Sequence, residues 1–276
     1  MEVTFWYGCN MVRHGDIIRA SVALLEAIGI EARAAGGASY CCGTAKDAHL
    51  AAAEGMAVRT VEKFNAIGND LVTWCPSCQI HMDHFMQHQA TPQFDVRHIT
   101  EMLHANRERL ATRLVHPIEM RVMVHQHVGF REVPAANLVA GLLELIPGIE
   151  VVPVDYEAPG HMCSAIARVP AAHADANRRT LALAREHDVQ ALVTVFHSCQ
   201  RLLCGFAATE SFEVVNYVSL LARAMGLDFA DEYGQWKQAV DDDDLMARIG
   251  ADRIARAGED FVRREILPEL RAKPRQ

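Results

Sequence analysis

The sequence predicts an α/β protein made of two similar halves, each a pair of Rossmann-like βαβ units around a parallel sheet, with a helical C-terminal tail. Short apolar runs alternate with longer helix-forming stretches, which is typical of parallel sheets covered by helices. A segment containing an apolar run and a cysteine occurs twice, and the 276 residues are enough for two domains. The expected units are residues 1–115, 116–230 and 231–276.

The first half opens with an apolar and aromatic run that is typical of a buried strand. Ile18, Val22 and Leu25 follow at the spacing of one helix face, and Gly29 provides a helix stop. Alanine and other helix formers dominate residues 45–67. The expected elements are strands at Val3–Tyr7, near Ile30 and at Asp70–Trp74, and helices before Gly29, at Ala45–Ile67 and at Ser77–His88.

The second half repeats this order. We expect strands at Met120–Val124, Ile149–Val154 and Ala191–Val195, and helices at Pro134–Ile146 and Ala172–His187. In the tail, residues 241–244 are all aspartate and precede a helical pattern over residues 245–265, where acids suit the positive end of a helix dipole.

The halves also match residue by residue at three places. The matches bring Cys9 opposite His127, so they predict corresponding sites in the two halves. The paired segments are Leu71–Gln79 with Leu192–Gln200, Tyr40–Gly43 with His161–Ser164, and Leu24–Ile28 with Leu142–Ile146.

Five of the eight cysteines form a spaced array: Cys9, the adjacent pair Cys41 and Cys42, and Cys75 and Cys78 in a Cys-Pro-Ser-Cys segment. Thiolates are soft ligands that favour iron-sulfur clusters, zinc or Cu(I). Neighbouring side chains diverge, so the adjacent pair suits two different metal atoms, and five thiolates exceed what a tetrahedral zinc ion accepts. The array therefore favours a multi-iron cluster, placed where the loops leave the carboxyl ends of the strands.

The expected compartment supports a metal site over a disulfide framework. The first residues show neither the basic nor the apolar region of an export signal, so we expect a cytoplasmic protein, in which clustered cysteines are more often metal ligands. A formal net charge of −8 opposes nonspecific nucleic-acid binding, and no apolar run is long enough to span a bilayer.

The array and its repeat resemble the cysteine-rich CCG domain of the B-type subunits of the heterodisulfide reductase family, of the divergent type found in sulfur-oxidising heterodisulfide-reductase-like complexes. The resemblance covers about residues 1–230. It implies that Cys9, Cys41, Cys42, Cys75 and Cys78 hold a noncubane [4Fe-4S] cluster.

The resemblance also implies an oxidoreductase acting on sulfur groups, active in a complex. Its partners would be a flavin-containing heterodisulfide reductase A-like subunit and a ferredoxin-like C-type subunit. The substrate would be a thiol or disulfide, handled at the cluster together with electron transfer. Two other classes stay open: an electron-transfer subunit of a flavin-dependent hydroxyacid oxidase, and a non-catalytic scaffold stabilised by zinc.

The second half departs from the family pattern. At the five matching positions it has His127, Met162, Cys163, Phe196 and Cys199, so it cannot hold a second noncubane cluster. Histidines flank these positions at His125, His161 and His197. The residues expected to bind metal here are His127, Cys163 and Cys199, helped by His161 or His197. Two cysteines with two histidines suit zinc or a Rieske-like [2Fe-2S] centre. The alternative is that this site has lost its metal ligands and binds no metal.

Two further groups of residues have a functional and an ordinary interpretation. His81, His84 and His88 share one expected helix face after Cys78, where they would relay protons or form a polar surface. Arg13 and the corresponding Arg131 follow the first ligand positions, where an arginine would bind an anionic substrate or remain an ordinary surface residue.

Overall fold

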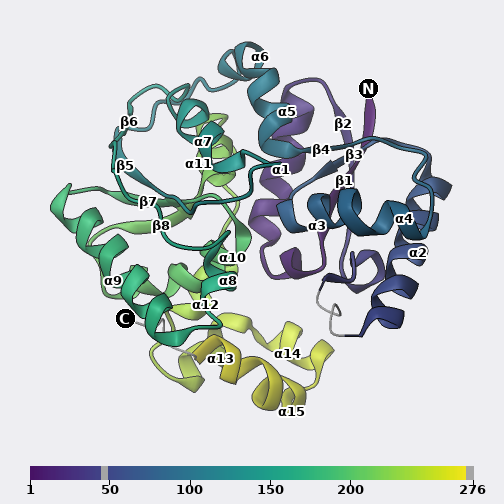
Figure 1. Cartoon of the computed structure of the whole chain (residues 1–276). Coiled ribbons are helices and arrows are strands. Elements are labelled where there is room, and N and C mark those ends of the chain that lie inside the picture. The colour runs from purple at the N-terminus through teal and green to yellow at the C-terminus, as the bar shows by residue number, and fades with distance from the viewer. Residues whose placement is uncertain (45–48, 272–276) are drawn as a thin grey trace.

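The structure, a computed structural model, describes residues 1–44 and 49–271, and these contain two parallel four-stranded sheets (Figure 1). The strand orders are β2-β1-β3-β4 and β6-β5-β7-β8. The strands are β1 (Glu2–Gly8), β2 (Glu31–Gly36), β3 (Leu71–Thr73), β4 (Val96–His98), β5 (Met120–His125), β6 (Ile149–Val151), β7 (Ala191–Thr194) and β8 (Glu213–Asn216).

The two sheets confirm the predicted pseudo-repeat. Each has its first strand in a central position, with the second strand on one side and the third on the other, all parallel. Thr4 pairs with Leu71 in the first sheet, and Val122 pairs with Ala191 at the corresponding place in the second. The loops that carry the cysteines therefore leave equivalent edges of equivalent sheets.

Helices connect the strands of the first half. The helix expected at Ala45–Ile67 is observed from Leu50 and ends at Gly68, which has a left-handed φ of 80°; residues 45–48 lie outside the described residues. The segments are η1 (Asn10–Arg13), α1 (Gly15–Ala27), η2 (Ala38–Tyr40), α2 (Leu50–Ile67), α3 (Pro76–His81), η4 (Met82–Met86), α4 (Gln87–Gln89), α5 (Ile99–Ala105) and α6 (Arg107–Ala111).

The helices of the second half lie at corresponding places. Its two expected helices are observed close to the predicted bounds, as α7 and α9. The segments are α7 (Ala135–Leu143), α8 (Cys163–Ile166), α9 (Pro170–Glu186), α10 (His197–Leu203), η5 (Cys204–Ala208) and α11 (Tyr217–Ala224).

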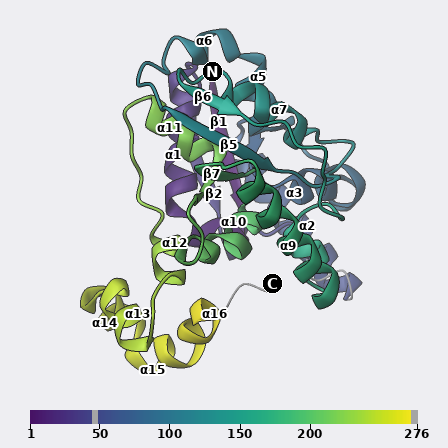
Figure 2. The same cartoon turned by 90° about the vertical axis from the view of Figure 1, so that its left-hand side faces the viewer.

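The C-terminal tail is helical, as expected, and lies at one end of the molecule (Figure 2). The predicted pattern is interrupted at Gly250 and Gly258, which have φ of 89° and 88°. Asp241 caps the helix that follows it by accepting a hydrogen bond from the Asp244 amide. The segments are α12 (Glu232–Lys237), α13 (Asp242–Ile249), α14 (Ala251–Ala257), α15 (Glu259–Phe261), η6 (Val262–Ile266) and α16 (Leu267–Arg271).

One hydrophobic core joins the two halves. Helix α1 packs against α11, and α5 packs against α7, so residues of both sheets contribute to a single apolar cluster (Figure 1). Trp74 stacks on Tyr217 with ring centroids 5.9 Å apart, and the Tyr217 hydroxyl lies 2.8 Å from that of Thr100. The boundaries at residues 115 and 230 stay a prediction.

The fourth strand of each sheet was not predicted. β4 and β8 are short and include the polar residues Arg97, His98, Glu213 and Asn216, so neither has the apolar run that marks the other strands. Among the described residues, no helix has the length and apolar character needed to cross a bilayer.

Candidate metal centres

The five cysteines of the array come together at the carboxyl edge of the first sheet. Cys9 directly follows β1, Cys41 and Cys42 follow the short η2 segment after β2, and Cys75 precedes helix α3 beyond β3. Cys78 lies in the first turns of α3. The sheet topology thus gathers residues from three loops, as expected for ligands in an open α/β fold.

The sulfur atoms lie in close pairs, and within residues 1–44 and 49–271 all eight cysteines are free thiols rather than disulfides. The Sγ atoms of Cys9 and Cys41 are 3.5 Å apart, and those of Cys42 and Cys78 are 3.6 Å apart. A disulfide bond would require about 2.05 Å. The Cys42 sulfur also lies 2.6 Å from the Thr44 hydroxyl, so a polar group of its own loop contacts it.

The close sulfur pairs divide the thiols into more and less acidic members. Hydrogen bonding with Cys42, and to a smaller extent with Cys9, lowers the pKa of Cys41 to about 2, and hydrogen bonding with Cys78 lowers the pKa of Cys75. The pKa values of Cys9, Cys42 and Cys78 are raised, first by hydrogen bonding to a neighbouring cysteine. Five thiolates so close together repel one another, so all five can ionise only around a cationic centre.

Gly8 allows the backbone to approach these sulfurs. Its φ is +78°, and a Cβ atom there would lie 3.4 Å from the Cys78 sulfur and 3.6 Å from the Cys75 Cβ. Glycine is the residue that adopts such a backbone conformation without steric cost. The turn after β1 can therefore bring Cys9 next to α3.

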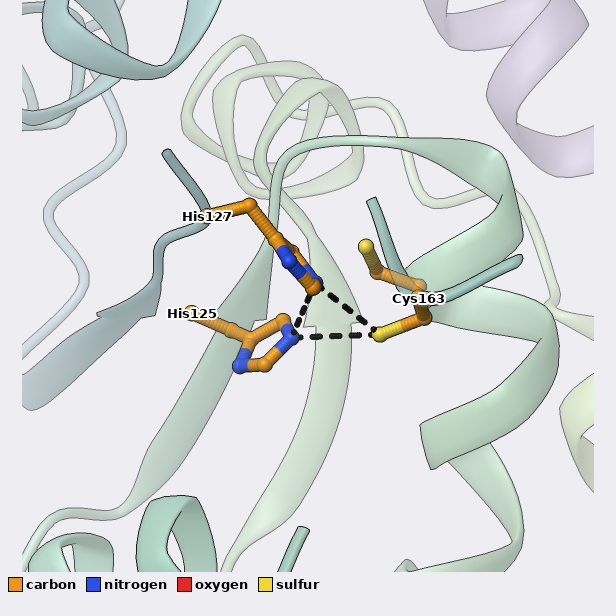
Figure 3. Close-up of side chains that lie close together, drawn as sticks. His125, His127 and Cys163 are labelled. Carbon is orange, nitrogen blue, oxygen red and sulfur yellow. Dashed lines mark hydrogen bonds between the residues drawn. The ribbon is translucent and has the colours of Figure 1, made fainter. Parts of the chain in front are cut away.

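A second group of ligand-type side chains lies at the equivalent edge of the second sheet. It comprises His125, His127, Cys163 and Cys199, whose donor atoms all lie within 4.8 Å of one another and which are all buried. Figure 3 shows the two imidazoles and the Cys163 sulfur directed toward one another. The Nε2 atoms are 3.1 Å apart and lie 3.2 and 3.3 Å from the Cys163 sulfur.

The outer nitrogens of both imidazoles contact other parts of the protein. His127 Nδ1 lies 3.2 Å from the Pro159 carbonyl oxygen, and His125 Nδ1 lies 3.4 Å from the Thr180 hydroxyl. This leaves each Nε2 facing the centre, which is the usual arrangement of metal-binding histidines. Although burial opposes ionisation, hydrogen bonding to Cys163 and the nearby His127 hold the pKa of Cys199 well below its usual value.

The structure brings together three of the five residues predicted for the second site. His127, Cys163 and Cys199 belong to the group, while His161 and His197 lie outside it and His125 takes part instead. His161 stacks on Phe130, and its Nδ1 lies 2.7 Å from the Gly129 carbonyl oxygen. His197 begins α10, two residues before Cys199.

The sequence contains one signal for His125 that the repeat alignment does not use. His125 ends β5 two residues before His127, and alternate residues of a strand point to the same face. The two imidazoles are therefore able to meet on one side of the sheet edge. The alignment makes His125 only a flanking residue, because it has no counterpart among the five cysteines.

Comparison with known protein families identifies the cysteine-rich part of the chain. Residues 3–83 match the family model of the CCG cysteine-rich domain. This CCG domain contains Cys9, Cys41, Cys42, Cys75 and Cys78, so the match covers the complete array. Together with the grouped cysteine and histidine side chains, it supports a metal-binding protein of redox type. No curated protein matches the sequence significantly.

Three solved structures show distant similarity to the chain. An aspartate racemase homologue from Pyrococcus horikoshii has 9% identity and a TM-score of 0.34, covering 82% of this chain and 97% of its own. A maleate cis-trans isomerase mutant from Nocardia farcinica has 14% identity and a TM-score of 0.30, with coverage of 82% and 94%. An arylmalonate decarboxylase mutant has 15% identity and a TM-score of 0.27, again with 82% and 94%. TM-scores this low establish nothing further about this chain.

A groove of about 440 Å³ lies between the CCG domain and the second half. On one side it is lined by Thr44 and by α3, and on the other by the segment around α8. It therefore adjoins residues next to both centres. The lining residues are Thr44, Ser77, Ile80, His81, His84, Phe130, His161, Met162, Ser164, Ala165 and Arg168.

The polar residues that follow the CCG ligands take different positions. His81 and His84 line the groove, whereas His88 is exposed outside it. Arg13 is bound by the tail: its Nε lies 2.8 Å from Glu269 Oε1 and its Nη2 lies 3.0 Å from Oε2. Arg131 is exposed. Arg168, rather than Arg13, is therefore the arginine that lines the groove.

Proposed function

We propose that the chain is an iron-sulfur redox subunit of a heterodisulfide-reductase-like complex. The observation that carries this proposal is the grouping of five unbridged cysteines from three segments of the CCG domain, four of them in sulfur pairs 3.5 and 3.6 Å apart. Cys9, Cys41, Cys42, Cys75 and Cys78 would hold a noncubane [4Fe-4S] cluster. Such a cluster supplies electrons to, or takes them from, a sulfur atom.

The groove beside Thr44 and α3 would admit the thiol or disulfide substrate. Arg168 and His161 would bind an anionic end of the substrate, since both lie on one wall and are exposed. His81 and His84 on the opposite wall would donate protons as sulfur is reduced. Cleaving one disulfide consumes two electrons and two protons and yields two thiols.

Partner subunits would supply those electrons. A flavin-containing A-like subunit exchanges electron pairs, and a ferredoxin-like C-type subunit carries them one at a time. One cluster per chain stores too few electrons for disulfide cleavage, so we expect turnover to be slow in the isolated chain and faster with these partners. The reduction potentials of the partner subunits would set the direction of electron flow.

The second centre would hold a single zinc ion in a structural role. Ligand distances of about 2.0–2.1 Å for nitrogen and about 2.3 Å for sulfur place tetrahedral donors roughly 3.3–3.8 Å apart. The observed nitrogen and sulfur separations of 3.1–3.3 Å are close to this range. In a [2Fe-2S] centre the cysteines and histidines bind different irons, which needs a wider arrangement. The compact group therefore favours one ion.

Iron analysis of anaerobically purified protein tests the first assignment. We expect a brown protein with about four irons per chain, as a single [4Fe-4S] cluster requires. Cys75→Ala should bleach it, whereas Cys204→Ala, which replaces a buried cysteine of a different apolar cluster, should keep its iron. Full iron content in the Cys75→Ala protein would falsify the assignment.

EPR spectroscopy with added thiols tests the substrate role. A thiol with an anionic group should change the spectrum of the oxidised protein, because a new sulfur ligand changes the electronic state of a metal centre. Arg168→Ala should raise the thiol concentration for half of this change about tenfold, since hydrogen bonds to charged groups contribute about 1.5–3 kcal/mol. Arg178→Ala, at an exposed arginine that pairs with Asp175, is the control. If no thiol changes the EPR spectrum of a protein that still accepts electrons, the chain transfers electrons without binding the substrate.

A further inference from the structure

A third group of ligand-type residues, which shares no member with the other two, lies where the start of α1 meets the start of α12. His14 precedes α1, Asp16 lies in the first turn of α1, and Asp231 caps α12. One donor atom from each residue lies within 4.8 Å of the others. The group thus connects the start of α1 in the first half with the first helix of the tail.

His14 has an unusual environment for a histidine. Its side chain is 0% exposed, and neither ring nitrogen has a hydrogen-bond partner among the residues that the structure describes. Its ring packs edge-on against Tyr233, with centroids 5.0 Å apart, which satisfies its carbon atoms but not its nitrogens. Buried polar groups in folded proteins are nearly always bonded, so an unpartnered buried imidazole beside two carboxylates is suited to binding a ligand.

The two carboxylates are held in place and keep free lone pairs. Asp231 accepts hydrogen bonds from Gln200 Nε2 and from the Gly234 amide, both at 2.8 Å. Asp16 accepts one from the Ser219 hydroxyl at 3.5 Å. A carboxylate has about four lone-pair positions, so both groups can accept a further partner. Such outer contacts are what orient metal ligands.

The positive charges nearby do not neutralise this pair of acids. Arg13 is engaged by Glu269, and Arg223 by Glu213 at 2.8 Å. Arg201 lies near His14 and balances at most one carboxylate. A buried carboxylate, Asp16, and a half-buried one, Asp231, with donor atoms within 4.8 Å of each other, are costly to ionise together without a neutralising cation.

We propose that His14, Asp16 and Asp231 bind a divalent first-row metal ion, of the class from Mn²⁺ to Zn²⁺. An imidazole with two carboxylates suits these ions better than Mg²⁺ or Ca²⁺, which prefer oxygen ligands alone. Asp16 and Asp231 also line a cavity of about 250 Å³, which has room for water molecules to complete the coordination. The ion connects α1 to α12 and so fastens the tail to the body of the molecule.

Mn²⁺ binding distinguishes this site from the two thiolate centres, because Mn²⁺ favours oxygen and nitrogen ligands over thiolate. The purified full-length protein is treated briefly with a chelator and titrated with MnCl₂, and the EPR signal of free Mn²⁺ is recorded. We expect about one tightly bound Mn²⁺ per chain, with a pulsed-EPR coupling to one histidine nitrogen. Binding should persist in His127→Ala, which alters the second centre.

The variants Asp16→Asn and Asp231→Asn should weaken Mn²⁺ binding at least tenfold. Asparagine preserves the size of the side chain and can still cap α12. Asp228→Asn is the matched control, because Asp228 lines the same cavity but does not belong to the three-residue group. Added Mn²⁺ should raise the melting temperature of the wild-type and Asp228→Asn proteins but not of the two ligand variants.

Three results would overturn the proposal. They are no tight Mn²⁺ binding by the wild-type protein, Mn²⁺ binding by both ligand variants as tight as that of the wild type, or loss of binding in His127→Ala. Circular dichroism shows whether the variants fold. If the variants do not fold, the pulsed-EPR coupling between Mn²⁺ and a histidine nitrogen in the wild-type protein tests the site. Absence of this coupling would count against the proposal. Iron content is measured in parallel, so failure of this site is distinguishable from failure of the cluster assignment.

Discussion

Met162 and Phe196 stand in the second half where Cys41 and Cys75 stand in the first, and both are buried. They fill with apolar atoms the positions that thiolates would need for a second cluster. His125 and His127 meanwhile direct their Nε2 atoms toward Cys163 (Figure 3). The same framework therefore carries different potential ligands at corresponding positions of the two halves.

Removing one histidine should empty the second centre without affecting the first. We expect His127→Ala to lose about one zinc ion per chain, because a structural zinc site needs four protein ligands. Metal analysis of the intact protein measures this, with iron as the internal reference. His161→Ala is the control and should keep its zinc, since the His161 ring stacks on Phe130. Eight irons per chain, signalling two full clusters, would refute the assignment.

His98 should make the stability of the protein depend on pH. Burial lowers its pKa to about 4, and its Nδ1 accepts a hydrogen bond from the Thr100 amide, which a proton would displace. In the unfolded chain the pKa is 6.5, so the unfolded state binds more protons between these values. The stability contributed by neutral His98 is fully present above about pH 6.5 and is lost as the pH falls toward 4, by about 3 kcal/mol in total.

Denaturant unfolding between pH 5 and 7 measures this contribution. His98→Asn keeps a good capping residue before α5 and should flatten the dependence by up to one proton. The control is His88→Asn, because His88 is exposed. Equal pH dependence in the wild-type and His98→Asn proteins would contradict the assignment.

At the scale of single elements, the end of β1 positions Cys9, the first cysteine of the array. Gly8, the last residue of β1, has a φ of +78°, and a Cβ atom there would lie 3.4 Å from the Cys78 sulfur. Gly8→Ala should destabilise the protein by about 1–2 kcal/mol, because a Cβ atom is strained in this conformation. Iron content should fall as well, since the turn positions Cys9. Thermal unfolding and iron analysis measure both effects.

Gly15→Ala provides the matched control for this turn. Gly15 begins α1 and has open space around its Cβ position, so alanine should be tolerated or stabilising. Equal iron content and stability in the two variants would show that the turn does not depend on glycine.

The elements also show what the sequence could predict and what it could not. Apolar strands and the cysteines after them were recognisable, because burial and ligation both constrain residue type. The strands β4 and β8 were missed because polar residues occupy them. The repeat aligned Cys9 with His127 but did not indicate that the His125 side chain would point toward Cys163. The grouping of His14 with Asp231 depends on a tertiary contact that no local pattern carries.

At the scale of the whole molecule, an ion pair between Arg13 and Glu269 holds the tail against the first half. Glu269→Gln should weaken this contact by up to about 1 kcal/mol, the usual value for a partly exposed pair. Amide hydrogen exchange in α16 should then be up to about fivefold faster. Glu265→Gln is the control, as its partner is the neighbouring Arg264. Unchanged exchange in Glu269→Gln would mean that this ion pair does not hold α16 against the first half.

Because one apolar core runs through both sheets, the two halves should melt together. If the first half binds the proposed iron-sulfur cluster, its brown colour would then report on the integrity of the second half, for which a colourless zinc ion is proposed. A variant that has lost its zinc would still be coloured at room temperature, but its absorbance should fade at a lower temperature than that of the wild type. A simple visible-light melting curve could therefore screen damage anywhere in the molecule, including at sites that absorb no light.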